Sequence, residues 1–108
     1  MVLPFEEEYR KKYYKLLDEV FESNFWSDGK MTRMFEEKFE EYTGLPSCAV
    51  TSGGAGLLSI FEYIGVRGYD VIVPANTFWA TTQAAKMAGA NIIYADCNKE
   101  DLCLSYED

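Results

Sequence analysis

Short apolar runs alternate with longer helix-like segments in the second half of the chain, and this alternation constrains the fold more than any other feature. The runs CAVT (48–51), VIVP (71–74) and NIIYA (91–95) each have the length of a strand. Between them lie AGLLSIFEYIG (55–65) and TFWATTQAAKMAG (77–89), which are long enough for crossover helices and end in glycine. This order predicts an α/β fold with a parallel sheet.

The first half of the chain has the periodicity of amphipathic helices. Apolar residues three and four apart predict one helix over roughly residues 5–22, and a second helix begins near Met31 and stops at Gly44. We therefore divide the chain into a helical segment, 1–45, and a partial α/β domain, 46–108. The apolar face of the first helix comprises Phe5, Tyr9, Tyr13, Leu16, Leu17 and Val20.

The predicted sheet is small for its class. Parallel sheets normally have helices on both faces, and a sheet of three strands leaves apolar edges uncovered. The chain also reaches its last residues, LSYED, without a capping element. We therefore expect an incomplete domain, the first βαβαβ part of a larger α/β unit.

Composition excludes several functional classes. The absence of histidine removes the Ser-His-Asp triad, the HExxH metal site and imidazole catalysis, and a net charge of −8 disfavours nucleic-acid and membrane partners. The three cysteines contain no CxxC pair, so we expect no disulfide framework and no metal site. No signal-peptide pattern and no membrane-spanning run is visible, which predicts a cytoplasmic protein.

A glycine-rich loop, TSGGAG (51–56), lies between the first predicted strand and the following helix. The unpaired N–H groups and the positive dipole end of a helix favour an anion at such a place. Small residues let a phosphate approach the backbone closely, and Ser52 could add a hydroxyl. The pattern is neither GxxxxGK[ST] nor GxGxxG, and a tight turn that binds nothing is the alternative interpretation.

A second loop, PANTFWAT (74–81), follows the second predicted strand. Ligands of open α/β sheets bind at this carboxyl edge. If Thr77 begins the next helix, Phe78 and Trp79 cannot both point into the core, so one can present its face to a planar ring; packing of both is the alternative. A phosphate site beside an aromatic platform fits a phosphorylated aromatic cofactor such as pyridoxal phosphate.

Four motifs in order resemble the DegT/DnrJ/EryC1/StrS sugar aminotransferase family. They lie in FWSDGKMTRMFEEKFEEYTG (25–44), CAVTSGGAGLL (48–58) and GYDVIVPANTFWATTQAAKMAGANIIYADC (68–97). The resemblance implies the large domain of a fold-type I pyridoxal-phosphate aminotransferase that works as a homodimer. It further implies a nucleotide-linked keto sugar as substrate and an amino acid, commonly glutamate, as amino donor.

The resemblance also implies which residues bind the cofactor. Gly53, Gly54 and Ala55 match the loop whose backbone holds the cofactor phosphate, and Phe78 matches the aromatic residue that stacks on the pyridine ring. The family's loop usually has threonine where this chain has Gly54. Without that hydroxyl, the phosphate would depend more on backbone N–H groups.

Three other residues match a segment near the active-site entrance of such enzymes. They are Trp26, Ser27 and Gly29, for which packing is the alternative to substrate contact. Lys86 lies in the crossover helix after Phe78, where a solvated surface lysine is expected, and Asp96 is expected to be structural.

The resemblance places the lysine that binds the cofactor covalently beyond the position of Asp108. The chain is therefore expected to contain no catalytic residue and to be inactive alone, as the N-terminal fragment of an aminotransferase. Some relatives replace that lysine with histidine and act as sugar dehydratases, which is the first alternative. A non-catalytic α/β binding module is the second.

Overall fold

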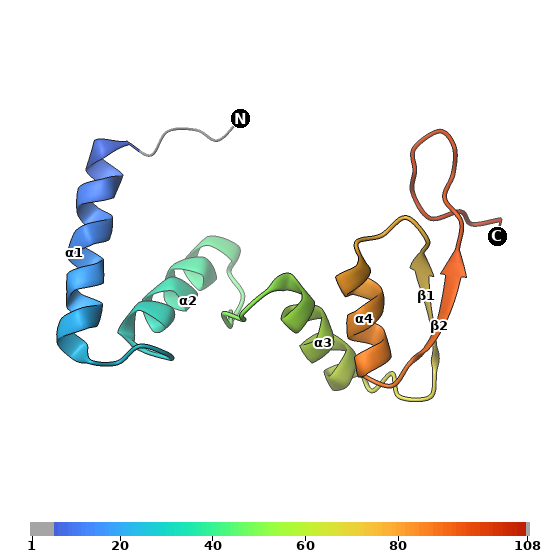
Figure 1. Ribbon diagram of the computed structural model, residues 1–108, viewed down its shortest axis with the longest axis horizontal. Coiled ribbons are helices and arrows are strands. Elements are labelled where there is room, and N and C mark those ends of the chain that lie inside the picture. The colour runs from blue at the N-terminus through green and yellow to red at the C-terminus, as the bar shows by residue number, and fades with distance from the viewer. Residues whose placement is uncertain (1–5, 108) are drawn as a thin grey trace. The chain divides into compact units, whose positions relative to one another are not determined.

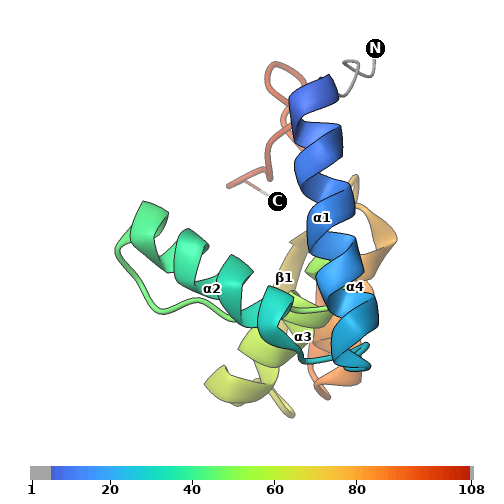
Figure 2. The same ribbon diagram turned by 90° about the vertical axis from the view of Figure 1, so that its left-hand side faces the viewer.

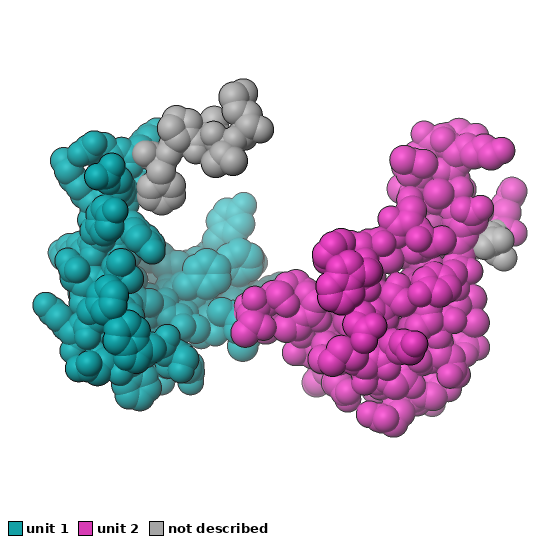
Figure 3. Space-filling model, in the orientation of Figure 1, with its two compact units in different colours: residues 1–49 teal, residues 50–108 magenta. Residues whose placement is uncertain are grey.

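The computed structural model describes residues 6–107, so Phe5 and the outer ends of both predicted segments lie outside it. The chain divides into two compact units, residues 1–49 and residues 50–108, which are coloured separately in Figure 3. The predicted division after residue 45 stays a prediction. Each unit is described by itself.

The first unit contains two helices, α1 (Glu7–Ser23) and α2 (Lys30–Thr43), which splay apart from the turn that joins them (Figures 1 and 2). Both predicted helices are thereby confirmed. Gly44, the predicted stop, has a φ of 72° and donates its N–H to the Glu40 carbonyl at 2.7 Å. Glycine adopts this left-handed conformation without steric cost, so α2 ends there.

The second unit contains α3 (Gly53–Ile64), β1 (Asp70–Pro74), α4 (Trp79–Met87) and β2 (Asn91–Ala95). The two strands pair in parallel, with the register running from Asp70 opposite Asn91 to Pro74 opposite Ala95. Figure 1 shows α4 between α3 and the strand pair. The arrangement confirms an α/β fold with parallel strands joined by a helical crossover.

The predicted strand at residues 48–51 is wrong. These residues belong to neither strand of the sheet, which contains only β1 and β2 among residues 6–107. The Ala49 N–H instead donates to the Glu36 Oε1 at 2.8 Å, and Val50 is half exposed. A strand is stabilised by hydrogen bonds to a neighbouring strand, and an apolar run without that neighbour remains irregular.

Small side chains form the core of the second unit. Alanines on one side of α4 let the helix approach the sheet closely, so the buried cluster contains little but short side chains. The face of the sheet opposite this cluster exposes Ile72 and Ile93. The cluster consists of Val66, Ala85, Ala88 and Ala90, with Leu58, Phe61, Val71 and Ile92 packed against it.

Candidate functional site

Ser52 caps the N-terminus of α3. Its backbone is extended, with φ −165° and ψ 165°, and its Oγ accepts the Ala55 N–H at 3.1 Å while its carbonyl accepts the Gly56 N–H at 3.0 Å. A serine in this position satisfies one of the helix N–H groups that have no partner within the helix. The glycine-rich loop is therefore an ordered helix cap.

Three donors remain available at this cap. Within residues 6–107, the amides of Gly53 and Gly54 have no hydrogen-bond partner, and the Ser52 hydroxyl hydrogen has no acceptor. The Ala55 amide, by contrast, is engaged by Ser52. These donors lie at the positive end of the α3 dipole, an arrangement that suits an anion such as a phosphate.

The second loop is a tight turn at the carboxyl end of β1. The Thr77 N–H donates to the Pro74 carbonyl at 3.2 Å, and the Ala75 N–H donates to the Ala95 carbonyl at 2.8 Å. Helix α4 begins at Trp79, two positions later than the sequence predicts, because Phe78 at the cap position has an extended backbone with φ −62° and ψ 133°. The Thr77 hydroxyl donates to the Thr81 Oγ1 at 3.2 Å. Phe78 therefore lies at the end of the turn, directly before α4.

The rings of Phe78 and Trp79 lie outside the buried core. Their side chains are 70% and 67% exposed, and their ring centroids are 5.6 Å apart with an interplanar angle of 49°. Each ring thus has a free face. An exposed aromatic face of this kind is what stacking on a planar ligand requires.

Both loops line one cavity of about 770 Å³, so the structure brings all four predicted cofactor residues together. The apolar wall of this cavity, formed by one side of α3 and one side of α4, was not predicted from the sequence. The sequence did contain a signal for it: the α4 residues that line the cavity recur at spacings of three and four, which places them on one side of the helix. The cavity is lined by Ser52, Gly53, Gly54, Ala55, Leu57, Leu58, Phe78, Trp79, Ala80, Thr81, Gln83, Ala84 and Met87.

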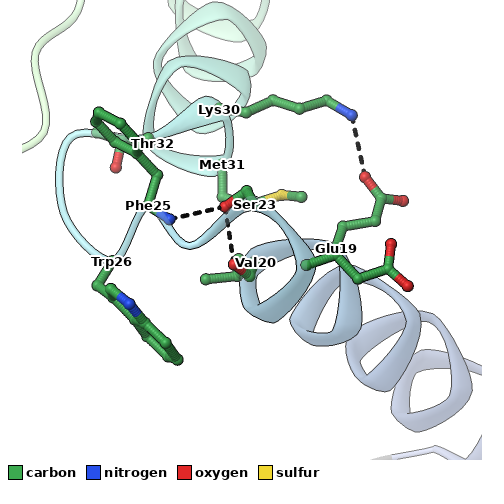
Figure 4. A pocket seen from close by; sticks show the side chains of 10 residues that line it. Glu19, Val20, Ser23, Phe25, Trp26, Lys30, Met31 and Thr32 are labelled. Carbon is green, nitrogen blue, oxygen red and sulfur yellow. Dashed lines mark hydrogen bonds and ion pairs between the residues drawn. The ribbon is translucent and has the colours of Figure 1, made fainter.

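Trp26 and Gly29 line a different cavity, of about 380 Å³, at the corner between α1 and α2 (Figure 4). The Trp26 ring packs edge-on against Phe21, with centroids 5.1 Å apart, and Lys30 pairs with Glu19 at 3.0 Å across the opening. Ser27 is not among the lining residues. Packing and ligand contact are both compatible with this placement of Trp26.

Lys86 and Asp96 lie away from the cavity beside the glycine-rich loop. Lys86 is exposed in the last turn of α4, where a cation interacts favourably with the helix dipole. Asp96 follows β2; its Oδ1 accepts the Cys97 N–H at 2.8 Å and its carbonyl accepts the Ser105 N–H at 2.8 Å. Neither residue lines that cavity.

A family model identifies the class of protein. Residues 7–108 match the DegT/DnrJ/EryC1/StrS aminotransferase family. The match covers nearly the whole chain and both structural units. The chain therefore belongs to this family, as an N-terminal segment of it.

Two curated relatives are named as an aminotransferase and a transaminase. The chain is 35% identical over 77 residues to the L-glutamine:2-deoxy-scyllo-inosose aminotransferase of Streptomyces fradiae, covering 69% of this chain and 18% of that protein. It is 30% identical over 94 residues to the dTDP-3-amino-3,6-dideoxy-alpha-D-galactopyranose transaminase of Aneurinibacillus thermoaerophilus, covering 82% of this chain and 25% of that protein.

A dehydratase is also among the relatives. The chain is 28% identical over 100 residues to the GDP-4-keto-6-deoxy-D-mannose 3-dehydratase of Yersinia pseudotuberculosis, covering 85% of this chain and 25% of that protein. The chain spans about a quarter or less of the length of these three curated relatives.

Proposed function

We propose that the chain is the N-terminal part of a longer protein, a pyridoxal-phosphate-dependent sugar aminotransferase. The term whole protein refers to that longer protein. One observation carries the proposal: the donors at the start of α3 and the exposed ring of Phe78 line the same cavity. A ligand that joins a phosphate to an aromatic ring matches this pairing. Family membership and the transaminase relatives support the same assignment.

Each residue has a proposed role toward the cofactor. The amides of Gly53 and Gly54 and the hydroxyl of Ser52 donate to the phosphate, and the Ala55 amide keeps Ser52 in its capping position. Phe78 lies against the pyridine ring and excludes water from one side of it. When bound, pyridoxal phosphate supplies an electron sink and carries the amino group between two substrates. The lysine that holds it is proposed to lie outside this chain.

The proposed substrate is a keto sugar, with a nucleotide-linked one favoured, and an amino acid donates the amino group. Several relatives are named for nucleotide-linked sugars, including a UDP-sugar transaminase of Campylobacter jejuni that is 31% identical over 85 residues. Trp26, Ser27 and Gly29 are proposed to lie near this substrate. A sugar dehydratase is the second candidate, because of the dehydratase relative.

The proposed assembly is a homodimer, as the family resemblance implies. Among residues 6–107, none of the helices is long and apolar enough to cross a membrane. A cytoplasmic location and the absence of nucleic-acid partners stay predictions, as does the inactivity of the chain by itself.

A spectroscopic titration of the whole protein tests the proposal. Adding pyridoxal phosphate should produce a saturable visible absorbance band that borohydride removes, because reduction traps the covalently bound cofactor. Incubation with an amino acid should then shift this band, whereas a dehydratase that has histidine in place of the lysine should retain no covalently attached cofactor after borohydride treatment. If no saturable band forms, the cofactor assignment is wrong.

A further inference from the structure

A side-chain hydrogen bond joins the Phe78 turn to a distant loop. The Asn76 Nδ2 donates to the Leu102 carbonyl at 3.0 Å, across 26 positions of sequence. Asn76 lies two residues before Phe78, inside the turn that the Thr77 N–H closes on Pro74. Its side chain is exposed and lines neither the cavity shared by Ser52 and Phe78 nor the cavity at Trp26.

The acceptor of this bond belongs to an ordered loop, residues 97–104. An antiparallel bridge pairs Cys97 with Leu104 at its base. Within the loop, the Asn98 N–H donates to the Cys103 carbonyl at 2.8 Å and the Leu102 N–H donates to the Asn98 carbonyl at 3.0 Å. These bonds fix the position of the Leu102 carbonyl.

Leu102 itself is held in a strained conformation. Its φ is 58°, in the left-handed region that a leucine rarely adopts. Such a conformation persists only where surrounding interactions hold it. The carbonyl that accepts the Asn76 amide belongs to this strained residue, so the strain and the hydrogen bond coincide at Leu102.

We infer that Asn76 is a positioning residue that anchors the Phe78 turn to the 97–104 loop and thereby sets the height of the Phe78 ring over the bound cofactor. The inference rests on the proposed cofactor site. Asn76 acts through the backbone of the turn and touches no ligand. In a variant that lacks the Asn76 side chain, the backbone hydrogen bonds of Ala75 and Thr77 can still form. Residue 76 loses its hydrogen bond to the Leu102 carbonyl, which lies outside the turn.

The sheet provides a matched control at its other end. The Asn91 Nδ2 donates to the Gly68 carbonyl at 3.3 Å, across 23 positions of sequence. This bond has the same chemistry, a similar sequence separation and an exposed setting, but it lies at the start of β2 rather than at the ligand-binding edge. Asn76→Ala and Asn91→Ala therefore remove equivalent bonds at opposite ends of the same strands.

The experiment compares pyridoxal phosphate affinity, cofactor circular dichroism and melting temperature in the whole protein and its variants. Asn76→Ala should weaken cofactor affinity about 3- to 10-fold, the range expected for one hydrogen bond, and should reduce the dichroic band of the bound cofactor. Asn91→Ala should lower the melting temperature similarly while leaving affinity and dichroism unchanged. Asn76→Asp keeps the shape but places a carboxylate oxygen against the Leu102 carbonyl, and should match Asn76→Ala.

The outcomes separate this inference from the proposed function. If the unmodified protein binds no pyridoxal phosphate, the proposed function fails. If it binds, but Asn76→Ala keeps full affinity and dichroism, or Asn91→Ala loses them equally, only the positioning role is wrong. Should Asn76→Ala fail to fold, unchanged affinity and dichroism in Asn76→Asp would overturn the inference and their loss would support it.

Discussion

Gly54 at the start of α3 faces Ala80 at the start of α4: a Cβ built at Gly54 would lie 3.5 Å from the Ala80 Cβ. This is ordinary van der Waals contact. The next nearest atom, the Ser52 Oγ, would lie 3.8 Å away. The glycine is therefore not required by space.

Gly54→Thr should improve both stability and cofactor binding. Replacing glycine within a helix by a residue with a side chain stabilises it by a few tenths of a kcal/mol, up to about 0.5 kcal/mol for threonine. The new hydroxyl would lie beside Ser52 and add a donor for the phosphate, which should tighten pyridoxal phosphate binding roughly 3- to 10-fold. Absorbance titration and thermal melting of the whole protein measure the two effects.

Gly54→Val is the matched control for this substitution. Valine has nearly the same shape as threonine but no hydroxyl, so it should bring no gain in cofactor affinity. Equal tightening by both variants would show that the hydroxyl does not contact the phosphate.

Phe78→Ala should weaken cofactor binding more than any other single change in the turn. Loss of a stacked aromatic ring costs about 1–2 kcal/mol, which is roughly a 5- to 30-fold loss of affinity. Phe78→Tyr retains the ring and should bind nearly normally. Trp79→Ala serves as the comparison, because Trp79 is equally exposed and lines the same cavity. If Trp79→Ala causes the larger loss, the roles of the two rings are exchanged.

Local periodicity was enough to predict most elements of this fold. Both N-terminal helices, both crossover segments and the strands around Val73 and Ile93 agree with the sequence pattern. The strand at residues 48–51 failed because an apolar run becomes a strand only when another strand supplies hydrogen bonds, and no local signal reports that partner. The Ala49 N–H instead donates to the Glu36 carboxylate.

Part of the candidate site could also be predicted from the sequence. The placement of the second loop at the carboxyl end of β1 follows from parallel topology, whereas the glycine-rich loop follows no strand of the sheet. Both loops nevertheless line one cavity. The roles of Gly53, Gly54, Ala55 and Phe78 stay predictions. The bond from Asn76 to Leu102 could not be predicted, because its acceptor is a backbone carbonyl that carries no side-chain signature.

Gly89→Ala should destabilise the second unit. Gly89 has a φ of 87°, and a Cβ there would meet the Arg67 Cγ and a guanidinium nitrogen at 3.1 Å. The conformational cost alone is about 1–2 kcal/mol. Gly68→Ala isolates that cost, since Gly68 has a φ of 78° and open space at its Cβ position. Chemical denaturation should show a larger loss for Gly89→Ala than for Gly68→Ala; equal losses would mean that Arg67 moves aside freely.

The 97–104 loop should loosen in acid through Asp101. The Cys103 N–H, at 2.9 Å, and then the Asn98 side-chain amide, at 3.2 Å, hold the pKa of the Asp101 carboxyl below its ordinary value of 3.8. Because the folded loop binds the proton less tightly than the unfolded chain, ionised Asp101 stabilises the loop. That contribution is complete above the unfolded pKa and is lost as pH falls through the lower folded pKa.

Amide hydrogen exchange of the loop, measured against pH, would detect this loss. Exchange protection at Cys103, corrected for the intrinsic pH dependence of exchange, should fall on acidification in the unmodified protein. Asp101→Asn should weaken protection at all pH values and abolish the acid-dependent step. The control is Glu100→Gln, because the Glu100 carboxylate makes no hydrogen bond within residues 6–107 and its loss should leave the step intact. A step that survives in Asp101→Asn would mean that another carboxyl controls the loop.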